Sequence, residues 1–325
     1  MRTLKYIFVT LLLLGIIGGV LSVRWFDNEI KAPGPLAAEK LFYIAPGTHI
    51  KDMAAALQTA DIIDSALAFR IDARVQSKLE PLKAGEYQYP SHVSISDVIA
   101  LLQSGKTYQH KITIPEGLMS FEIVTLLNKE TALTGTITPV PPEGSLLPET
   151  YKYSYGDTRQ SVINRMKKAM QETLDSLWQK HEPGLPLSEQ EAVVLASIVE
   201  KETGLAAERP RVAGVFLNRL HKGIPLQSDP TVIYALTLGQ SVLGRPLTSA
   251  DLKKPSPFNT YVASGLPPAP IANPGKASLA AVMNPEKNDY IYFVADGSGG
   301  HAFAKTLQEH NSNVAKWRAL EKKAN

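Results

Sequence analysis

The most pronounced hydrophobic feature of the chain is an uncharged apolar run from residue 6 to residue 23. As an α-helix rising about 1.5 Å per residue, this run is roughly 27 Å long, which nearly matches the hydrocarbon core of a bilayer. A cleaved secretory signal is the alternative. The run is long for a signal, however, and Leu21-Ser22-Val23 offers no small-x-small cleavage site. We therefore predict a transmembrane anchor over residues 6–23.

The charges that flank this run predict its orientation. Arg2 and Lys5 precede it, whereas the charged residues that follow it directly sum to zero. Because positively charged flanks are retained in the cytoplasm, we expect a short cytoplasmic tail over residues 1–5. Everything after the anchor is then extracytoplasmic, beginning with a linker over residues 24–39.

A short pattern recurs three times after the linker: an extended segment, a proline turn and an amphipathic helix. The turns contain Pro46, Pro90 and Pro115, and apolar residues recur at helical spacing after each one. Separations of 44 and 25 residues between these prolines exclude a regular repeat array. The pattern predicts a small strand-and-helix module over residues 40–107. Whether this module binds a polymer or is only a spacer stays open.

A larger second domain is predicted over residues 108–325, and the fold class is therefore α+β. Proline-rich loops separate its apolar helical stripes, and a strand–turn–strand pattern at 290–304 is typical of a hairpin. Helices are expected at 161–180, 188–203 and 208–221, in a short segment opening at Thr231, and at 314–325.

One helix of this domain carries two acids close to its C-terminal end. Ser188 and Glu191 form a capping-box signature at its start. Glu202 continues the apolar stripe of this helix, whereas Glu200 is rotated away from the stripe, so we predict that Glu202 faces the protein interior. Burial raises the pKa of a carboxyl and suits it to give and take a proton near neutral pH.

The alternative for Glu202 is a structural ion pair. Arg209, Arg211 and Arg219 all follow on the next predicted helix, and each is a possible partner. A carboxylate paired in this way stabilises the fold and needs no catalytic role.

Polar residues that could bind a substrate lie in the loops after this helix. Gln227, Ser228 and Asp229 fall in one irregular loop, where Asp229 could equally be the N-cap of the next helix. Asn259 and Tyr261 lie in a second, proline-rich loop. His301 falls in the predicted hairpin and is better explained by a structural role there.

Composition excludes several classes of function. The formal net charge is only +3 and no long basic run occurs, so nucleic-acid binding is not expected. The chain has no cysteine, which removes disulfides, thiolate metal sites and a cysteine nucleophile. It also lacks a phosphate-binding loop, a Gly-x-Ser-x-Gly elbow and a His-Glu-x-x-His helix. We expect no metal and no cofactor.

Several blocks of the sequence, taken in order, resemble the endolytic murein transglycosylase family, also called YceG-like. The resemblance rests on residues 147–151, 195–203, 215–220, 226–234 and 292–303. It implies a single-pass inner-membrane protein in which a LysM-like module precedes the catalytic domain. It also implies cleavage of peptidoglycan glycan strands between N-acetylmuramic acid and N-acetylglucosamine. The family's catalytic glutamate matches Glu202, and Glu149 stands where the family usually has an aspartate.

The mechanism implied by the resemblance needs only one carboxyl, whereas ordinary glycosidases use two. Glu202 would protonate the glycosidic oxygen and then deprotonate the muramoyl C6 hydroxyl, which closes a 1,6-anhydro ring. The expected partners are glycan strands, the membrane and peptidoglycan synthases, and the expected role is to end strand elongation. The residues expected to bind substrate are Asn218, Gln227, Ser228, Asp229, Asn259, Tyr261 and Glu149.

Two other functions remain open. A muramidase-type hydrolase would use Asp229 or Glu149 to position water. A non-enzymatic adaptor would bind the cell wall through residues 40–105 alone.

Overall fold

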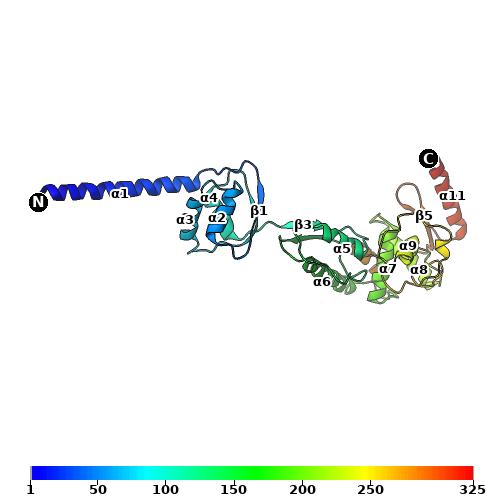
Figure 1. The fold of residues 1–325 in the computed structure, drawn as a ribbon. Coiled ribbons are helices and arrows are strands. Elements are labelled where there is room, and N and C mark those ends of the chain that lie inside the picture. Colours follow the sequence, from blue (N-terminus) through cyan, green and yellow to red (C-terminus); the bar gives the residue numbers. More distant parts are fainter. Residues whose placement is uncertain (1, 325) are drawn as a thin grey trace. The chain divides into compact units, whose positions relative to one another are not determined.

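A computed structural model describes residues 2–324 of the chain, which form a mixed α+β protein with an apolar N-terminal helix (Figure 1). The chain divides into two compact units. Unit 1 comprises the chain up to His110 together with Tyr153–Tyr155. Unit 2 comprises Lys111–Lys152 and the chain from Gly156 onward.

Helix α1 (Arg2–Lys31) contains the apolar run and continues beyond it. Its segment Tyr6–Lys31 is long and apolar enough to cross a membrane, and its most apolar stretch is not covered by protein. The helix ends later than the predicted residue 23 because its last turns are stabilised separately. Lys31 pairs with Asp27 at 2.7 Å, and Ile30 is buried in the core of unit 1.

The rest of unit 1 is a small module of two strands and three helices. Strands β1 (Lys40–Ile44) and β2 (Gly85–Tyr89) pair antiparallel, with Lys40 opposite Tyr89 and Ile44 opposite Gly85. The chain between them forms α2 (Ile50–Thr59) and α3 (Ala66–Gln76), and α4 (Ile95–Ser104) follows β2. The first two predicted strand–proline–helix sequences are thus confirmed as β1–α2 and β2–α4.

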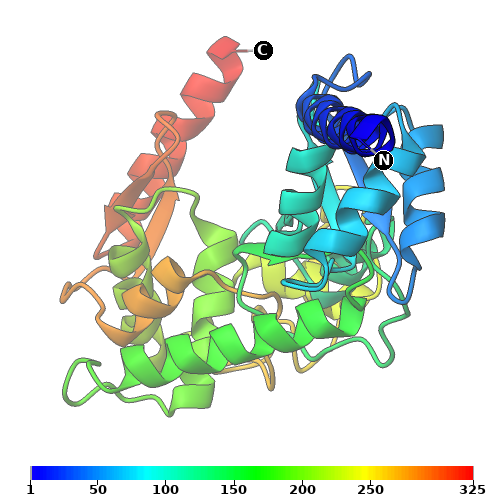
Figure 2. The same ribbon diagram turned by 90° about the vertical axis from the view of Figure 1, so that its left-hand side faces the viewer.

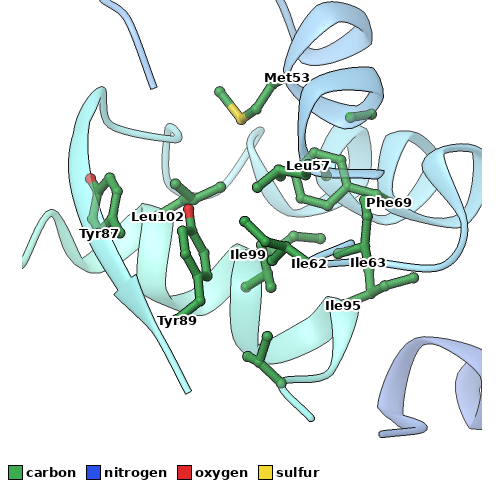
Figure 3. Packing of buried hydrophobic residues seen from close by; sticks show 14 of the residues in the cluster. Met53, Leu57, Ile62, Ile63, Phe69, Tyr87, Tyr89, Ile95, Ile99 and Leu102 are labelled. Atoms are coloured by element: carbon green, nitrogen blue, oxygen red, sulfur yellow. The ribbon is translucent and has the colours of Figure 1, made fainter. Parts of the chain in front are cut away.

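The core of unit 1 lies between the helices and the sheet (Figure 3). Tyr87 and Tyr89 point inward from β2 while Gln88 between them is exposed, as the period of two of a strand requires. Leu57 and Phe69 are fully buried from α2 and α3. The core is completed by residues that include Met53, Ile62, Ile63, Ile95, Ile99 and Leu102.

Unit 2 begins with the third predicted strand and helix. Strands β3 (His110–Thr113) and β4 (Thr150–Tyr153) pair, and the unit takes up the chain at Lys111. Helices α5 (Ser120–Lys129) and α6 (Arg159–Trp178) belong to this part.

The remainder of unit 2 is built on three helices that pack against one another: α7 (Glu189–Glu202), α8 (Arg209–His221) and α10 (Lys276–Met283). The predicted capping box of Ser188 and Glu191 is present at the start of α7. A hairpin of β5 (Tyr292–Ala295) and β6 (His301–Ala304) and the terminal helix α11 (Leu307–Ala324) complete the unit. Helix α11 begins seven residues before the predicted start.

One correction concerns the short helix α9 (Asp229–Thr237), which a single-turn helix at Asp251–Lys253 follows. Ser228 occupies the N-cap position and Asp229 is the first helical residue. Asp229 is therefore not the cap of this helix. Its side chain is available for other contacts, which the next section describes.

Candidate active site

Glu202 is the last residue of α7, and the preceding turns of that helix place it against the core of unit 2. Ile198 and Val199, four and three residues earlier, are completely buried. The Ser228 hydroxyl donates a hydrogen bond of 2.5 Å to Glu202 Oε1. Burial raises the pKa of the Glu202 carboxyl above its ordinary value of 4.5, and the Ser228 hydrogen bond opposes this shift only in part.

The charges around Glu202 act on its pKa in both directions. The negative charge of Asp229 raises it further, whereas His301 and Arg219 lower it. Within the described part of the chain, no cation forms an ion pair with Glu202 within 4.0 Å. Its only direct side-chain partner there is a neutral hydroxyl.

The guanidinium of Arg219 is held by backbone carbonyls. Its Nε donates to Ile291 O at 2.7 Å and its Nη1 to Leu226 O at 2.6 Å. It also lies 5.7 Å from the centre of the Tyr292 ring. Arg219 therefore ties α8 to the hairpin and to the Ser228 loop, and it brings a buried positive charge near the acid without neutralising it.

Ser228 is fixed by a network of buried hydroxyls. Its backbone N–H donates to Thr260 Oγ1 at 3.0 Å, and Thr231 Oγ1 donates to its carbonyl at 2.6 Å. Thr231 and Thr260 lie 2.8 Å apart through their hydroxyls. Gln227, just before Ser228, has a left-handed backbone (φ +50°), which is unusual for a residue other than glycine. This loop geometry directs the Ser228 hydroxyl at Glu202.

Asp229 and Tyr261 form a second polar pair beside the acid. Tyr261 Oη donates to Asp229 Oδ1 at 2.6 Å. Burial first, and then the carboxylate of Asp229, raise the pKa of the Tyr261 phenol, and the charge of Glu202 adds to this effect. Both side chains therefore lie within electrostatic range of Glu202.

His301 is held by Glu208, the residue at the N-cap of α8. Its backbone N–H and Nδ1 lie 2.9 and 2.7 Å from the two carboxylate oxygens of Glu208. The prediction of a structurally satisfied hairpin histidine is confirmed, but His301 also lies close enough to act on the pKa of Glu202. The sequence does not predict its partner Glu208. A helix cap 93 positions away gives no local signal for such a pairing.

Two of the predicted substrate-binding residues make hydrogen bonds that hold the fold. Asn218 donates through Nδ2 to Asn288 O at 2.8 Å and to Tyr290 O at 2.9 Å, which fixes the loop before β5. Asn259 has no exposed surface, and its polar atoms bond within the protein. Its Nδ2 donates to Lys254 O at 2.8 Å, and its Oδ1 accepts from Tyr261 N at 3.0 Å. It therefore positions Tyr261.

Glu149 is exposed, and its Oε1 accepts only the backbone N–H of Thr150, at 2.9 Å. Its charge acts on Glu116 and Tyr151. Of the seven predicted binding residues, Ser228, Asp229 and Tyr261 thus surround Glu202, with Gln227 adjoining Ser228 in the same loop.

Glu200 corrects the prediction that only Glu202 faces inward. The Glu200 side chain is 5 % exposed, because Arg209 Nη2 donates to its Oε1 at 3.2 Å and Gly275 N to its Oε2 at 2.8 Å. The predicted ion pair with Arg209 therefore exists, but on Glu200. A Cβ atom at Gly275 would come within 1.9 Å of Glu116 Oε1, so a larger residue there would have to displace the Glu116 side chain.

No group of three or more histidine, aspartate or glutamate side chains suited to a metal ion occurs among residues 2–324. The groups around Glu202 are hydroxyls and buried charges.

The comparison with family models matches residues 42–316 to the YceG-like family. The chain belongs to the YceG-like family. The match spans most of unit 1 and nearly all of unit 2, including every residue described above around Glu202.

Relatives with assigned names support this membership. The endolytic murein transglycosylase of Bacillus subtilis is 32 % identical over 309 residues, which cover 84 % of this chain and 83 % of that protein. The endolytic murein transglycosylase of Streptococcus pneumoniae R6 is 29 % identical, and the match covers 57 % of its length. The chain thus spans little more than half of that longer relative.

A solved structure also matches this fold. The crystal structure of a YceG-like protein from Listeria monocytogenes has a TM-score of 0.52 and 31 % identity, and the match covers 85 % of this chain and 99 % of the other.

Proposed function

We propose that this YceG-like protein is a membrane-anchored lytic transglycosylase that cuts peptidoglycan glycan strands internally, with Glu202 as the general acid and base. The named relatives support the enzyme class and a murein substrate. The observation that carries the proposal is Glu202 itself. It is an acid that has no ion pair among the described residues and whose pKa is raised by burial, and loops rich in hydroxyls surround it.

The reaction uses this single carboxyl twice. Protonated Glu202 donates its proton to the glycosidic oxygen while the bond from that oxygen to C1 of N-acetylmuramic acid breaks. The resulting carboxylate then takes the proton of the C6 hydroxyl, whose oxygen bonds to C1 and closes the 1,6-anhydro ring. The proton returns to Glu202 and no water is consumed. An attacking group on the same sugar gains from high effective molarity.

The raised pKa matters because the first step needs the protonated acid. Ser228 holds one carboxyl oxygen in place, and Asp229 disfavours ionisation of Glu202. The positive charge that develops on the sugar ring in such reactions is stabilised by a nearby carboxylate, and Asp229 is the residue suited to this role.

The same proximity favours a second candidate, a muramidase-type hydrolase. In that case Asp229 orients a water molecule, and the product carries a reducing end. Glu149, the other residue considered for this role, is exposed, and its carboxylate accepts the backbone N–H of Thr150. Product chemistry separates the two reactions.

Helix α1 is proposed as a single-pass anchor in the inner membrane, with the N-terminus cytoplasmic and both units extracytoplasmic. The apolar stretch supports a membrane span, but a signal sequence has the same properties. Retention is favoured because α1 continues into unit 1, where Ile30 is 7 % exposed and Phe26 packs against the core. Anchoring would confine cutting to new strands near the membrane and would let the enzyme end their elongation.

Unit 1 is proposed as a LysM-like module that brings glycan to the enzyme, and peptidoglycan synthases are proposed as neighbours. The strand–helix–helix–strand order of β1, α2, α3 and β2 supports a small polymer-binding module. If this module were the only functional part, the protein would be a non-enzymatic adaptor.

The test is to digest purified glycan strands with the full chain and to weigh the products by mass spectrometry. We expect muramic ends that are lighter by one water, formed by wild type and absent with Glu202→Gln. Glu189→Gln, the same change in the first turn of the same helix, is the matched control and should cleave like wild type. Reducing muramic ends would establish the hydrolase, and no cleavage by wild type would favour the adaptor.

A further inference from the structure

Helix α3 of unit 1 leaves a row of large apolar side chains uncovered. Leu67, Ile71 and Val75 recur every four residues and are 64 %, 45 % and 63 % exposed, and Leu79 just beyond the helix is 89 % exposed. At this spacing they form one stripe along the helix. None of them belongs to the core of unit 1. A contiguous exposed stripe of this kind marks a surface that is covered by something else in use.

Basic side chains flank the stripe. Arg70 and Arg74 lie on the outer side of α3 next to the apolar row, and Lys78 follows the helix. None of the three forms an ion pair within the described part of the chain, whereas Glu80 nearby is paired with Lys83. Apolar residues bordered by free arginine and lysine are typical of helices that lie at the surface of an anionic bilayer.

The position of α3 within unit 1 fits such a surface. Helix α3 packs against α1. In Figure 1 it runs across the direction of α1 and lies at the end of the module from which α1 emerges, while β1 lies at the opposite end. Figure 2 shows α1 nearly end-on, so that the viewer looks at the module from this same side. If α1 crosses a membrane, α3 lies along the surface of that membrane.

We propose that the outer face of α3 is a membrane-binding surface that inserts Leu67, Ile71 and Val75 at the headgroup–acyl boundary of an anionic bilayer. Arg74 and Lys78 then face lipid phosphates, and their aliphatic stems cover apolar surface. The inference rests on the proposed role of α1 as an anchor and adds a second contact. A single helix leaves the module free to rotate and tilt, whereas two contacts at an angle fix its orientation on the membrane.

The absence of cysteine makes the test direct, because one introduced cysteine carries the only label. The full chain is reconstituted into vesicles of phosphatidylcholine and phosphatidylglycerol, with an environment-sensitive fluorophore on Leu67→Cys, Ile71→Cys or Val75→Cys. Leu41→Cys is the matched control, since Leu41 is an exposed leucine (40 %) of the same unit on β1. Quenching by lipids that carry a nitroxide near the headgroup is then measured.

We expect the three α3 positions to be quenched several-fold more strongly than position 41. Quenching should fall when Arg74→Glu and Lys78→Glu are combined or when the vesicles lack phosphatidylglycerol. Labels on α3 that are as accessible to water as the label at position 41 would overturn the proposal. The proposal would also be overturned if the α3 labels were shielded from water without lipid and if this shielding rose with protein concentration. A second copy of the chain would then cover the stripe.

A label on Val20→Cys separates this failure from failure of the anchor. If the lipid nitroxides quench the label at position 20 but not the labels on α3, α1 is an anchor and only the proposed α3 contact is wrong. If position 20 is not quenched and the protein does not float with the vesicles, the anchor itself is wrong.

Discussion

Glu200 and Glu202 lie two residues apart at the end of α7, yet their surroundings are opposite in kind. Glu200 meets the Arg209 guanidinium and the N–H of Gly275. Glu202 meets one neutral hydroxyl, with an aspartate close by. A paired carboxylate is held by its partners and stabilises the fold. An unpaired carboxyl in a buried site can exchange a proton.

The comparison shows that burial alone does not distinguish the proposed catalytic acid from a structural one. Both side chains are enclosed by protein, and the partner of each decides its role. A third acid supports this view. Burial raises the pKa of Glu143 to about 7, but its carboxylate accepts hydrogen bonds from Ser120 N, Ser120 Oγ and Asn273 Nδ2. These bonds tie the loop at 142–145 to α5, which is a structural role for Glu143.

The largest expected difference lies between Glu202→Gln and Glu200→Gln. Loss of a general acid and base costs about 10²–10⁴-fold in rate, so Glu202→Gln should lower kcat by that factor and leave the fold intact. Glu200→Gln should lower the thermal midpoint and keep most of the activity per folded molecule. Circular dichroism and glycan-cleavage rates on matched samples measure both effects. The reverse pattern would exchange the roles assigned to the two acids.

Removing the cation of the Glu200 cluster should be the largest effect on stability. Arg209→Met leaves Glu200 and Glu116 facing each other without a positive charge, and breaking a buried pair costs about 3–5 kcal/mol. Arg211→Met is the matched control, because its pair with Glu286 is exposed and worth about 0–1 kcal/mol. Urea denaturation measures both values. Equal losses for the two variants would show that the Arg209 cluster is no stronger than a surface pair.

Removing the Ser228 hydroxyl should reduce activity and move the pH profile upward. Its hydrogen bond lowers the pKa of Glu202, so Ser228→Ala should shift the alkaline limb of kcat/KM to higher pH. Loss of the positioning bond should reduce kcat/KM about 10-fold. The control is Ser278→Ala, since Ser278 is equally buried and its Oγ has no hydrogen-bond partner among the described residues. A similar effect of both substitutions would exclude a specific role for Ser228.

Removing the charge of Asp229 should shift the same limb the other way. Asp229 raises the pKa of Glu202, so Asp229→Asn should lower it. In the proposed mechanism protonated Glu202 is the active form, and the loss of activity with rising pH should therefore begin at a lower pH than in wild type. A pH–rate profile of kcat/KM checks the sign. Shifts of the same sign in Ser228→Ala and Asp229→Asn would contradict the electrostatic picture of the site.

The smallest expected effect concerns Glu143. Its pKa of about 7 in the folded protein lies above the unfolded value near 4.5, so its contribution to stability is complete below pH 4.5 and is lost as the pH rises through 7. The free energy of unfolding of the wild type should therefore fall by on the order of 1 kcal/mol between pH 5 and 8, once screening at this partly exposed site is included. In Glu143→Gln this fall should be absent. Denaturation at the two pH values measures it. Cleavage activity should not change.

The sequence predicted the elements of unit 2 well where they depend on local rules. The α7 capping box, the apolar stripe that contains Glu202 and the β5–β6 hairpin are properties of neighbouring residues, and all three are present. The loop at 227–229 lies beside the acid-bearing helix as its polar residues predict, with Ser228 bonded to Glu202 and Asp229 acting on its pKa. A substrate-binding role for these residues stays a prediction.

The errors arise where distant segments meet. Nothing near Glu200 in the sequence shows that Gly275 donates to it, 75 positions later. The buried amide of Asn259 likewise depends on the path of the loop at 251–254. The positions of Arg219 and Glu208 depend on contacts with the β5–β6 hairpin. Helical periodicity identified the inward side of α7, but only the tertiary structure shows which acid on α7 is paired.

The most direct test of the account is a titration of the Glu202 carboxyl in the intact protein. Glutamate labelled with ¹³C at the carboxyl carbon is followed by NMR from acid to neutral pH, and Glu202→Gln identifies the signal by its absence. We predict that Glu202 titrates above the ordinary value of 4.5 and moves downward in Asp229→Asn. A carboxyl that titrates at or below 4.5 in wild type would be ionised when substrate binds, and Glu202 could then not be the acid.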